Sequence, residues 1–182
     1  NFRPKLFLTF GRSCGDKGSM PPGWFRSIVV RCGISLVGAV SLSHTVLADF
    51  AAGERAYSLG QFAKAIEEFR PLVERGDPKA QMMTGLMYLQ GNGYARSAEK
   101  AAVWLYKAAT KGDHSAQLVL GSQLLYGQGI PRDLPAALMW LTLAGQSETV
   151  GVVKQAQIFS NDAKSRMTAA QITGATKRAG RF

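Results

Sequence analysis

The sequence predicts an all-α protein built from stacked, antiparallel helix pairs. A 36-residue segment occurs twice without a gap, because residues 76–111 and 112–147 are identical at 13 of 36 aligned positions. Both copies begin with Gly-Asp, a pair that suits the end of one helix and the start of the next. Small and large apolar residues recur at offsets of 3, 4 and 7, which place them on one helix face. A single helix pair cannot bury such a face alone, so neighbouring pairs are expected to stack.

Residues 1–48 are expected to lie outside the helical domain. Residues 1–19 are interpreted as an upstream extension from a misplaced start, and residues 20–48 as a signal peptide. Arg26 and Arg31 supply its positive start, an apolar run follows, and small residues mark a cleavage site after Ala48. This pattern predicts a periplasmic or secreted protein with no membrane association after cleavage. The alternative is an inner-membrane anchor, although the uncharged run is short for a span of ~20 residues.

Charge and cysteine content narrow the possible functions. The chain has 22 basic and 12 acidic residues, net +10, of which 16 basic and 11 acidic residues, net +5, follow residue 48. No basic block resembles a nucleic-acid footprint, so no nucleic-acid partner is expected. Cys14 and Cys32 both precede residue 49, so the exported protein would have no thiol for a disulfide, a metal site or a nucleophile.

Residues 49–75 form a shorter first repeat. Gly53, Tyr57, Ala65 and Phe69 hold positions equivalent to those of the later copies, but the connecting loop is four residues shorter. This unit is therefore expected to contain one helix pair that begins the stack.

In the two full copies, the first helices are expected at about 78–90 and 114–126. Asp77 and Asp113 suit N-caps, because a carboxylate accepts hydrogen bonds from free backbone N–H groups. Gly76 and Gly112, directly before them, suit the left-handed residue that ends the preceding helix.

The loops and second helices of the copies also correspond. Gly91-Asn92-Gly93 returns as Gly127-Gln128-Gly129 and is interpreted as a hinge, since it lacks the Lys-Ser/Thr of a P-loop. Trp104 and Trp140 recur in the second helices and are expected to face small residues of the first helices.

Residues 148–182 are expected to form C-terminal capping helices, at about 150–162 and 168–179, and a basic tail. Thr168 and Gln171 have the spacing of a capping box, and Met167 and Ile172 that of a hydrophobic staple. This segment would cover the last apolar face of the stack.

The pattern GDxxAQxxxGxxxxxGxG…AxxWLxxA, at a period of 36, resembles the Sel-1-like repeat, a longer relative of the tetratricopeptide repeat. The first unit is similar to the tetratricopeptide form itself. Two departures are visible: Ser97 replaces an acidic residue, and Thr84 stands where an aliphatic core residue is usual. The resemblance covers 76–147 well and 50–179 loosely. It implies a right-handed α-solenoid that binds other proteins, often as an adaptor in signalling or envelope assembly.

Candidate catalytic residues are few. His114 is the one histidine after residue 48 and follows an N-cap, with no serine–carboxylate arrangement assigned around it. Glu99 and Asp133 are surface or loop candidates and do not predict the paired carboxylates of a glycosidase. No catalytic, cofactor-binding or metal-ligating residue is predicted, and the chain is not expected to be an enzyme.

The predicted function is therefore non-catalytic binding of a protein or peptide, as an adaptor or scaffold, on the concave face that the first helices line. The candidate partner-binding residues share that face of the two full copies: Gln81, Met83, Met87, Gln117, Val119 and Gln123. For the methionines, a place in the core is an equally weighted alternative. Two other functions stay open: an envelope enzyme or accessory factor of peptidoglycan metabolism, and a membrane-anchored scaffold.

Overall fold

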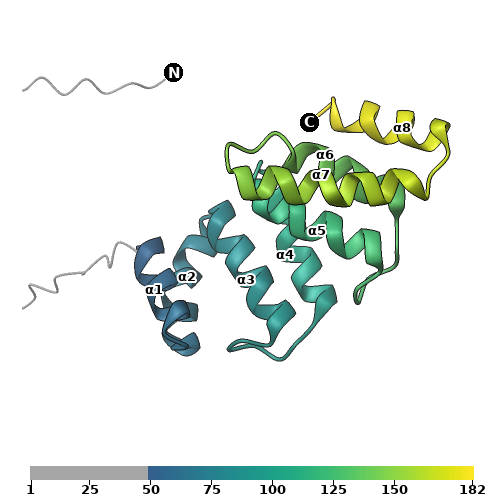
Figure 1. Cartoon of the computed structure of the whole chain (residues 1–182). Coiled ribbons are helices and arrows are strands. Elements are labelled where there is room, and N and C mark those ends of the chain that lie inside the picture. Colours follow the sequence, from purple (N-terminus) through teal and green to yellow (C-terminus); the bar gives the residue numbers. More distant parts are fainter. Residues whose placement is uncertain (1–48) are drawn as a thin grey trace, which may run out of the picture. The chain divides into compact units, whose positions relative to one another are not determined.

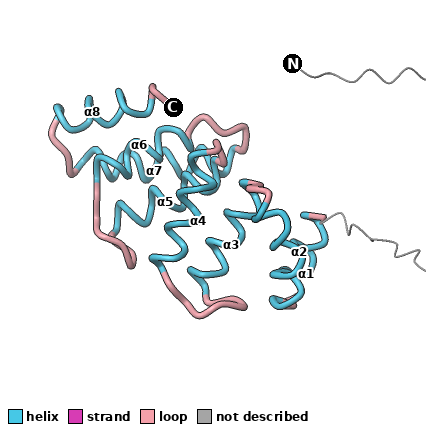
Figure 2. Tube along the Cα trace, turned by 180° about the vertical axis from the view of Figure 1, so that it is seen from behind, coloured by secondary structure: helices cyan, strands magenta, loops and turns pink. Residues whose placement is uncertain are grey.

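The computed structural model describes residues 49–182, which form eight α-helices and no strand (Figures 1 and 2). The expectations for residues 1–19, for the signal peptide at 20–48 and for cleavage after Ala48 lie outside the described residues. None of the helices in 49–182 combines the length and apolar character needed to cross a membrane. The all-α prediction is confirmed for this part of the chain.

The helices follow one another as antiparallel neighbours, and each contacts the next from α1 to α7. Their bounds are α1 Phe50–Ser58, α2 Phe62–Glu74, α3 Pro78–Gln90, α4 Ala98–Thr110, α5 His114–Tyr126, α6 Leu134–Ala144, α7 Val150–Ser165 and α8 Ala169–Ala179. The bounds of α3 and α5 are the expected ones.

Short polar side chains fix where the helices begin. Asp77 and Asp113 accept a hydrogen bond from the backbone N–H three residues on, at 2.8 and 2.7 Å. Ser97 does the same for α4 at 3.2 Å, so the departure from an acidic residue keeps the N-cap. The expected capping box between Thr168 and Gln171 is confirmed at the start of α8.

Each helix pair is held closely together by a glycine in its first helix. A Cβ on Gly85 would lie 2.8 Å from Leu105 Cγ, and one on Gly121 would lie 2.8 Å from Leu141 Cγ. The tryptophans were expected to face these small residues, and that expectation was wrong: the neighbouring leucines cover them. Trp104 and Trp140 instead lie one residue earlier on α4 and α6, and they line hollows shared with α2 and α4 of the preceding pairs.

The glycine loops have the hinge geometry expected of them. Gly91 and Gly127 end α3 and α5 in the left-handed conformation, with φ of 80° and 68°. Gly93 and Gly129 also have positive φ, 78° and 77°, which residues with a side chain rarely adopt. The chain therefore reverses between the helices of a pair through backbone conformations that favour glycine.

The C-terminal helices pack on the last repeat. α6 contacts both α7 and α8, and Ala163 and Ala175 from these two helices are fully buried against Leu138 and Leu141 of α6. α7 continues to Ser165, three residues beyond the expected end, before the Thr168 cap starts α8. This segment covers an apolar face that would otherwise be exposed to water.

Candidate functional site

The six residues expected to bind a partner are mostly inside the fold. Met83 and Met87 are 8% and 0% exposed and belong to the core between the first unit and α3. The burial therefore favours the core alternative for both methionines. Their assignment to partner binding stays a prediction.

The three glutamines of the set are buried as well, and Val119 is partly buried. Gln117 Nε2 donates to the Ala109 carbonyl at 3.0 Å, which ties the start of α5 to the end of α4. Gln81 and Gln123 are 4% and 2% exposed, and their Oε1 atoms have no hydrogen-bond partner. Gln117 therefore links two successive repeats, whereas the unpaired Oε1 atoms of Gln81 and Gln123 are buried at a cost in free energy.

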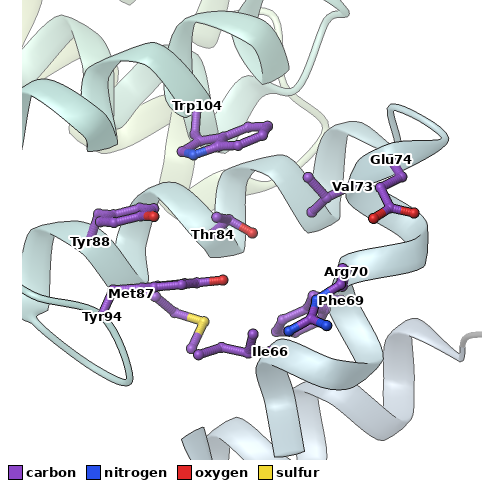
Figure 3. A pocket seen from close by; sticks show the side chains of 10 residues that line it. All are labelled: Ile66, Phe69, Arg70, Val73, Glu74, Thr84, Met87, Tyr88, Tyr94 and Trp104. Atoms are coloured by element: carbon purple, nitrogen blue, oxygen red, sulfur yellow. The ribbon is translucent and has the colours of Figure 1, made fainter. Parts of the chain in front are cut away.

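Two hollows lie instead at the junctions between helix pairs, one lined by Trp104 and the other by Trp140. The first, here called the α2–α4 cavity, has a volume of about 230 Å³ and is shown in Figure 3. Its lining comes from α2, α3, the loop after α3, and α4: Ile66, Phe69, Arg70, Val73, Glu74, Thr84, Met87, Tyr88, Tyr94 and Trp104. Tyr88 and Tyr94 lie at one end, Val73 and Glu74 at the other, and Trp104 lies across from Ile66.

The second, here called the α4–α6 groove, is shallower and more apolar. Its lining comes from α4, α5, the loop after α5, and α6: Ala102, Val103, Tyr106, Lys107, Leu120, Leu124, Ile130, Ala136 and Trp140. Val103 and Tyr106 are each 54% exposed, which is unusual for an apolar and an aromatic side chain that lie together. Lys107 is the one charged residue of the lining.

The two hollows occupy the same place in successive repeats. Thr84, Tyr88, Tyr94 and Trp104 in the cavity align, 36 residues on, with Leu120, Leu124, Ile130 and Trp140 in the groove. In the preceding helices, the alignment of Ala65 with Ala101 pairs Ile66 with Ala102 and Arg70 with Tyr106. The repeat therefore places a hollow at each junction between helix pairs, and the residues at these positions decide its chemistry.

The tryptophans differ in exposure although their positions are equivalent. Trp140 is 3% exposed, with Tyr106 at 5.8 Å between ring centroids and Phe182 at 5.4 Å. Trp104 is partly exposed, and the Lys107 ammonium lies 4.1 Å from its ring centroid. Because Lys107 also lines the groove, its charge lies between the two hollows.

Electrostatics in the cavity centre on the tyrosines. Tyr88 and Tyr94 stack with centroids 4.3 Å apart and an angle of 12° between their rings. Burial, with a smaller contribution from Tyr88, raises the pKa of Tyr94, while the positive charge of Arg70 lowers it. The phenol is therefore neutral at physiological pH and is available as a hydrogen-bond donor and acceptor.

His114 has a structural position. Its Nδ1 lies 3.0 Å from Gln117 Oε1 on the same helix, next to the Asp113 N-cap. Within residues 49–182, no group of three His, Cys, Asp or Glu side chains is placed to hold a metal ion. Glu99 accepts from the Ser97 hydroxyl at 2.9 Å and Asp133 caps α6, so both expected surface carboxylates serve helix starts.

The first helices, α3 and α5, were predicted to bind a partner, with Val119 and Gln123 among the residues on α5, whereas the groove is lined by their neighbours Leu120 and Leu124. The prediction did not include Val103 and Tyr106. These two apolar residues lie outside the buried set of α4, which comprises Ala101, Leu105, Ala108 and Ala109. That position off the buried stripe is the signal that would have identified them.

Comparisons with known proteins give the same repeat. The Sel1 repeat family model matches residues 78–113 and 114–147. The crystal structure of a protective antigen of uropathogenic Escherichia coli with an SLR fold aligns with a TM-score of 0.67 and 29% identity. A Sel1 repeat protein from Oxalobacter formigenes aligns with a TM-score of 0.54 and 22% identity, which supports the fold alone. No curated protein matches the sequence significantly.

The coverage of these comparisons is partial. The E. coli alignment covers 72% of this chain and 28% of that one, and the O. formigenes alignment covers 68% and 58%. The present chain thus spans less than two thirds of either structure. Sel1 repeats are typically protein–protein interaction modules and generally form non-catalytic scaffolds. Residues 78–147 therefore comprise two Sel1 repeats, set within an all-α solenoid fold.

Proposed function

We propose that this protein is a non-catalytic, exported binding module that holds a protein segment in the α4–α6 groove, in the periplasm. The observation that carries the proposal is the exposed apolar lining of that groove, in which Val103 and Tyr106 are 54% exposed over Leu120 and Leu124. Covering exposed apolar surface of this kind with a partner is favourable, because it removes the surface from water. Its position between consecutive Sel1 repeats agrees with the usual role of such repeats.

The chemistry of the groove favours an apolar segment with acidic flanks. Tyrosine and tryptophan are enriched at the centres of protein interfaces, and Tyr106 and Trp140 contact each other edge to face here. Lys107 at the edge contributes a positive charge, which attracts a partner carboxylate and raises the association rate. The export part of the proposal is supported by the leader-like sequence of residues 20–48.

Site-specific photo-crosslinking in cells tests the groove. A photoreactive phenylalanine derivative at Tyr106 should give a defined adduct with one protein, whereas the same residue at Tyr126, an exposed tyrosine outside the groove, should not. With the purified partner, Tyr106→Asp should weaken Kd at least about ten-fold, because charge at an interface centre remains unpaired. Ile158→Asp, on an apolar residue of α7 that is 59% exposed, should leave Kd unchanged.

Two results would contradict the proposal. Identical adducts from Tyr106 and Tyr126 would show that the groove has no selective partner. Equal effects of Tyr106→Asp and Ile158→Asp on Kd would place the interface elsewhere. Sequencing of the mature N-terminus tests export separately, since cleavage after Ala48 leaves Asp49 as the first residue.

A further inference from the structure

The α2–α4 cavity is large enough for a side chain from outside the chain. Its volume is about 230 Å³, and an apolar protein cavity of about 150 Å³ already accepts benzene. Phe69 and Met87, 1% and 0% exposed, form its buried part, while Tyr88, Tyr94 and Trp104 present rings to it (Figure 3). An aromatic guest would therefore meet ring faces and edges on several sides.

One buried position of the cavity lining carries a smaller side chain than its counterpart in the next repeat. Thr84 stands where the next repeat has Leu120, which is 4% exposed and fills the equivalent position. The Thr84 hydroxyl donates to the Ala80 carbonyl at 2.9 Å, so its own hydrogen bond is satisfied within α3. Threonine therefore fills less of the cavity than leucine would, and its hydroxyl needs no partner from a ligand.

Two opposite charges mark the open side of the cavity. Arg70 and Glu74 lie one turn apart on α2, and both are exposed. The ion pairs found in residues 49–182 are Asp49–Arg55 and Asp162–Arg166, so Arg70 and Glu74 are not paired with each other. A guanidinium donates hydrogen bonds and a carboxylate accepts them, and a peptide backbone offers C=O and N–H groups that match both.

We propose that the α2–α4 cavity takes one large aromatic side chain of a bound protein segment, whose backbone passes between Arg70 and Glu74. This inference rests on the proposed protein-binding function and adds a second anchor, one repeat away from the groove. The aromatic lining selects the side chain, and the two opposite charges select a peptide backbone over an isolated ring.

Small capped amino acids test the cavity without a known partner. In the full chain labelled with ¹⁵N, N-acetyl-L-tryptophanamide should shift the Trp104 indole N–H signal saturably, with Kd on the order of 0.1–1 mM. The signal is identified by its loss in Trp104→Phe. N-acetyl-L-alaninamide, which has the same backbone groups but a methyl side chain, should produce no saturable shift.

Matched variants locate the binding. Thr84→Leu, which introduces the residue of the next repeat, should weaken binding at least about ten-fold by filling the cavity. Thr84→Val has nearly the volume of threonine and should leave binding unchanged. Should Thr84→Leu fail to fold, Thr84→Met fills the space with a more adaptable side chain. Arg70→Gln together with Glu74→Gln should weaken the capped amide by several-fold.

The outcomes separate this inference from the proposed function. Absence of a saturable shift, or equal binding by Thr84→Leu and Thr84→Val, overturns the cavity assignment, whereas the crosslink at Tyr106 tests the groove independently. Free L-tryptophan binding more tightly than its capped amide would overturn the peptide source, because it would identify a zwitterionic amino acid as the ligand.

Discussion

The α2–α4 cavity and the α4–α6 groove are the same structural position in consecutive repeats, yet they present different surfaces. Both lie between the second helix of one pair and the first helix of the next, and both have a tryptophan from the following second helix. In the cavity that tryptophan remains partly exposed above a threonine. In the groove it is buried against Tyr106 and Phe182, above a leucine.

The difference shows how a repeat separates scaffold from specificity. The glycine–leucine contacts that join the helices of a pair are nearly identical in the two full copies, since a Cβ added at Gly85 or Gly121 would lie 2.8 Å from a leucine Cγ in both. The residues that line the hollows are free of this constraint, because they face the next pair. Substitution there changes the ligand chemistry while the helix pair keeps its geometry.

Removal of each tryptophan is expected to produce the largest difference in stability between the two junctions. Trp140→Ala should lower the free energy of unfolding by about 3–5 kcal/mol, because it empties a buried, ring-contacted position. Trp104→Ala should cost only about 1–2 kcal/mol, since its ring already borders an open cavity. Urea unfolding of both variants measures the difference. Equal losses would show that the two junctions are energetically the same.

A second test concerns the hinges beside the hollows. Gly93→Val should destabilise by about 2–3 kcal/mol, because it combines positive φ with crowding: a Cβ there would lie 2.8 Å from Ile66 Cδ1. Gly112→Val is the matched control, since Gly112 also has positive φ but no atom within 4 Å of an added Cβ. It should cost about 1–2 kcal/mol from backbone strain alone.

The Gly93→Val and Gly112→Val variants are compared by chemical unfolding at one temperature. A larger loss for Gly112→Val than for Gly93→Val would mean that backbone strain, and not contact with the cavity wall, sets the requirement for glycine. Ile66 also lines the α2–α4 cavity, so Gly93→Val should weaken capture of the capped tryptophan, while Gly112→Val should not.

A third test exchanges the residues that distinguish the junctions. Leu120→Thr should destabilise by about 2 kcal/mol, because apolar area is lost from a buried site. Thr84→Leu should stabilise by up to about 1 kcal/mol, because it fills existing space and removes no required hydrogen bond. Thermal and urea unfolding report both signs. A loss of stability in Thr84→Leu would show that the cavity walls cannot accept a larger side chain.

Much of the fold could be predicted because it depends on local and repeated signals. The Asp77 and Asp113 caps and the Gly91 and Gly127 helix ends each act within a few residues, so spacing alone placed α3 and α5. The position of Trp104 could not be obtained in this way. Whether a residue on a second helix faces its own pair or a neighbouring one depends on packing between pairs, which the repeat pattern does not specify.

The candidate site was less predictable for the same reason. Met83 and Met87 were expected on a binding face, but they pack in a core with Phe69 of α2, and Gln81 is buried as well. The exposed residues, Val103 and Tyr106, lie on a second helix, whereas the binding face was expected on the first helices. A pattern of apolar residues identifies both core and binding surface, and only tertiary contacts separate the two.

The smallest expected effect is the pH dependence of stability at the Gly112-Asp113 junction. Burial raises the pKa of Asp113 above its ordinary value of 3.8, although its hydrogen bond from Ala116 and the charges of His114 and Lys79 lower it. A raised pKa in the folded state means that the contribution of Asp113 to stability is fully present below 3.8 and declines as pH rises through the folded pKa. Asp113→Asn keeps an N-cap acceptor but does not titrate. Urea unfolding from about pH 3 to about pH 6 should therefore show the variant gaining stability relative to the native protein as pH rises. The opposite trend would show that attraction by His114 and Lys79 outweighs burial at this junction.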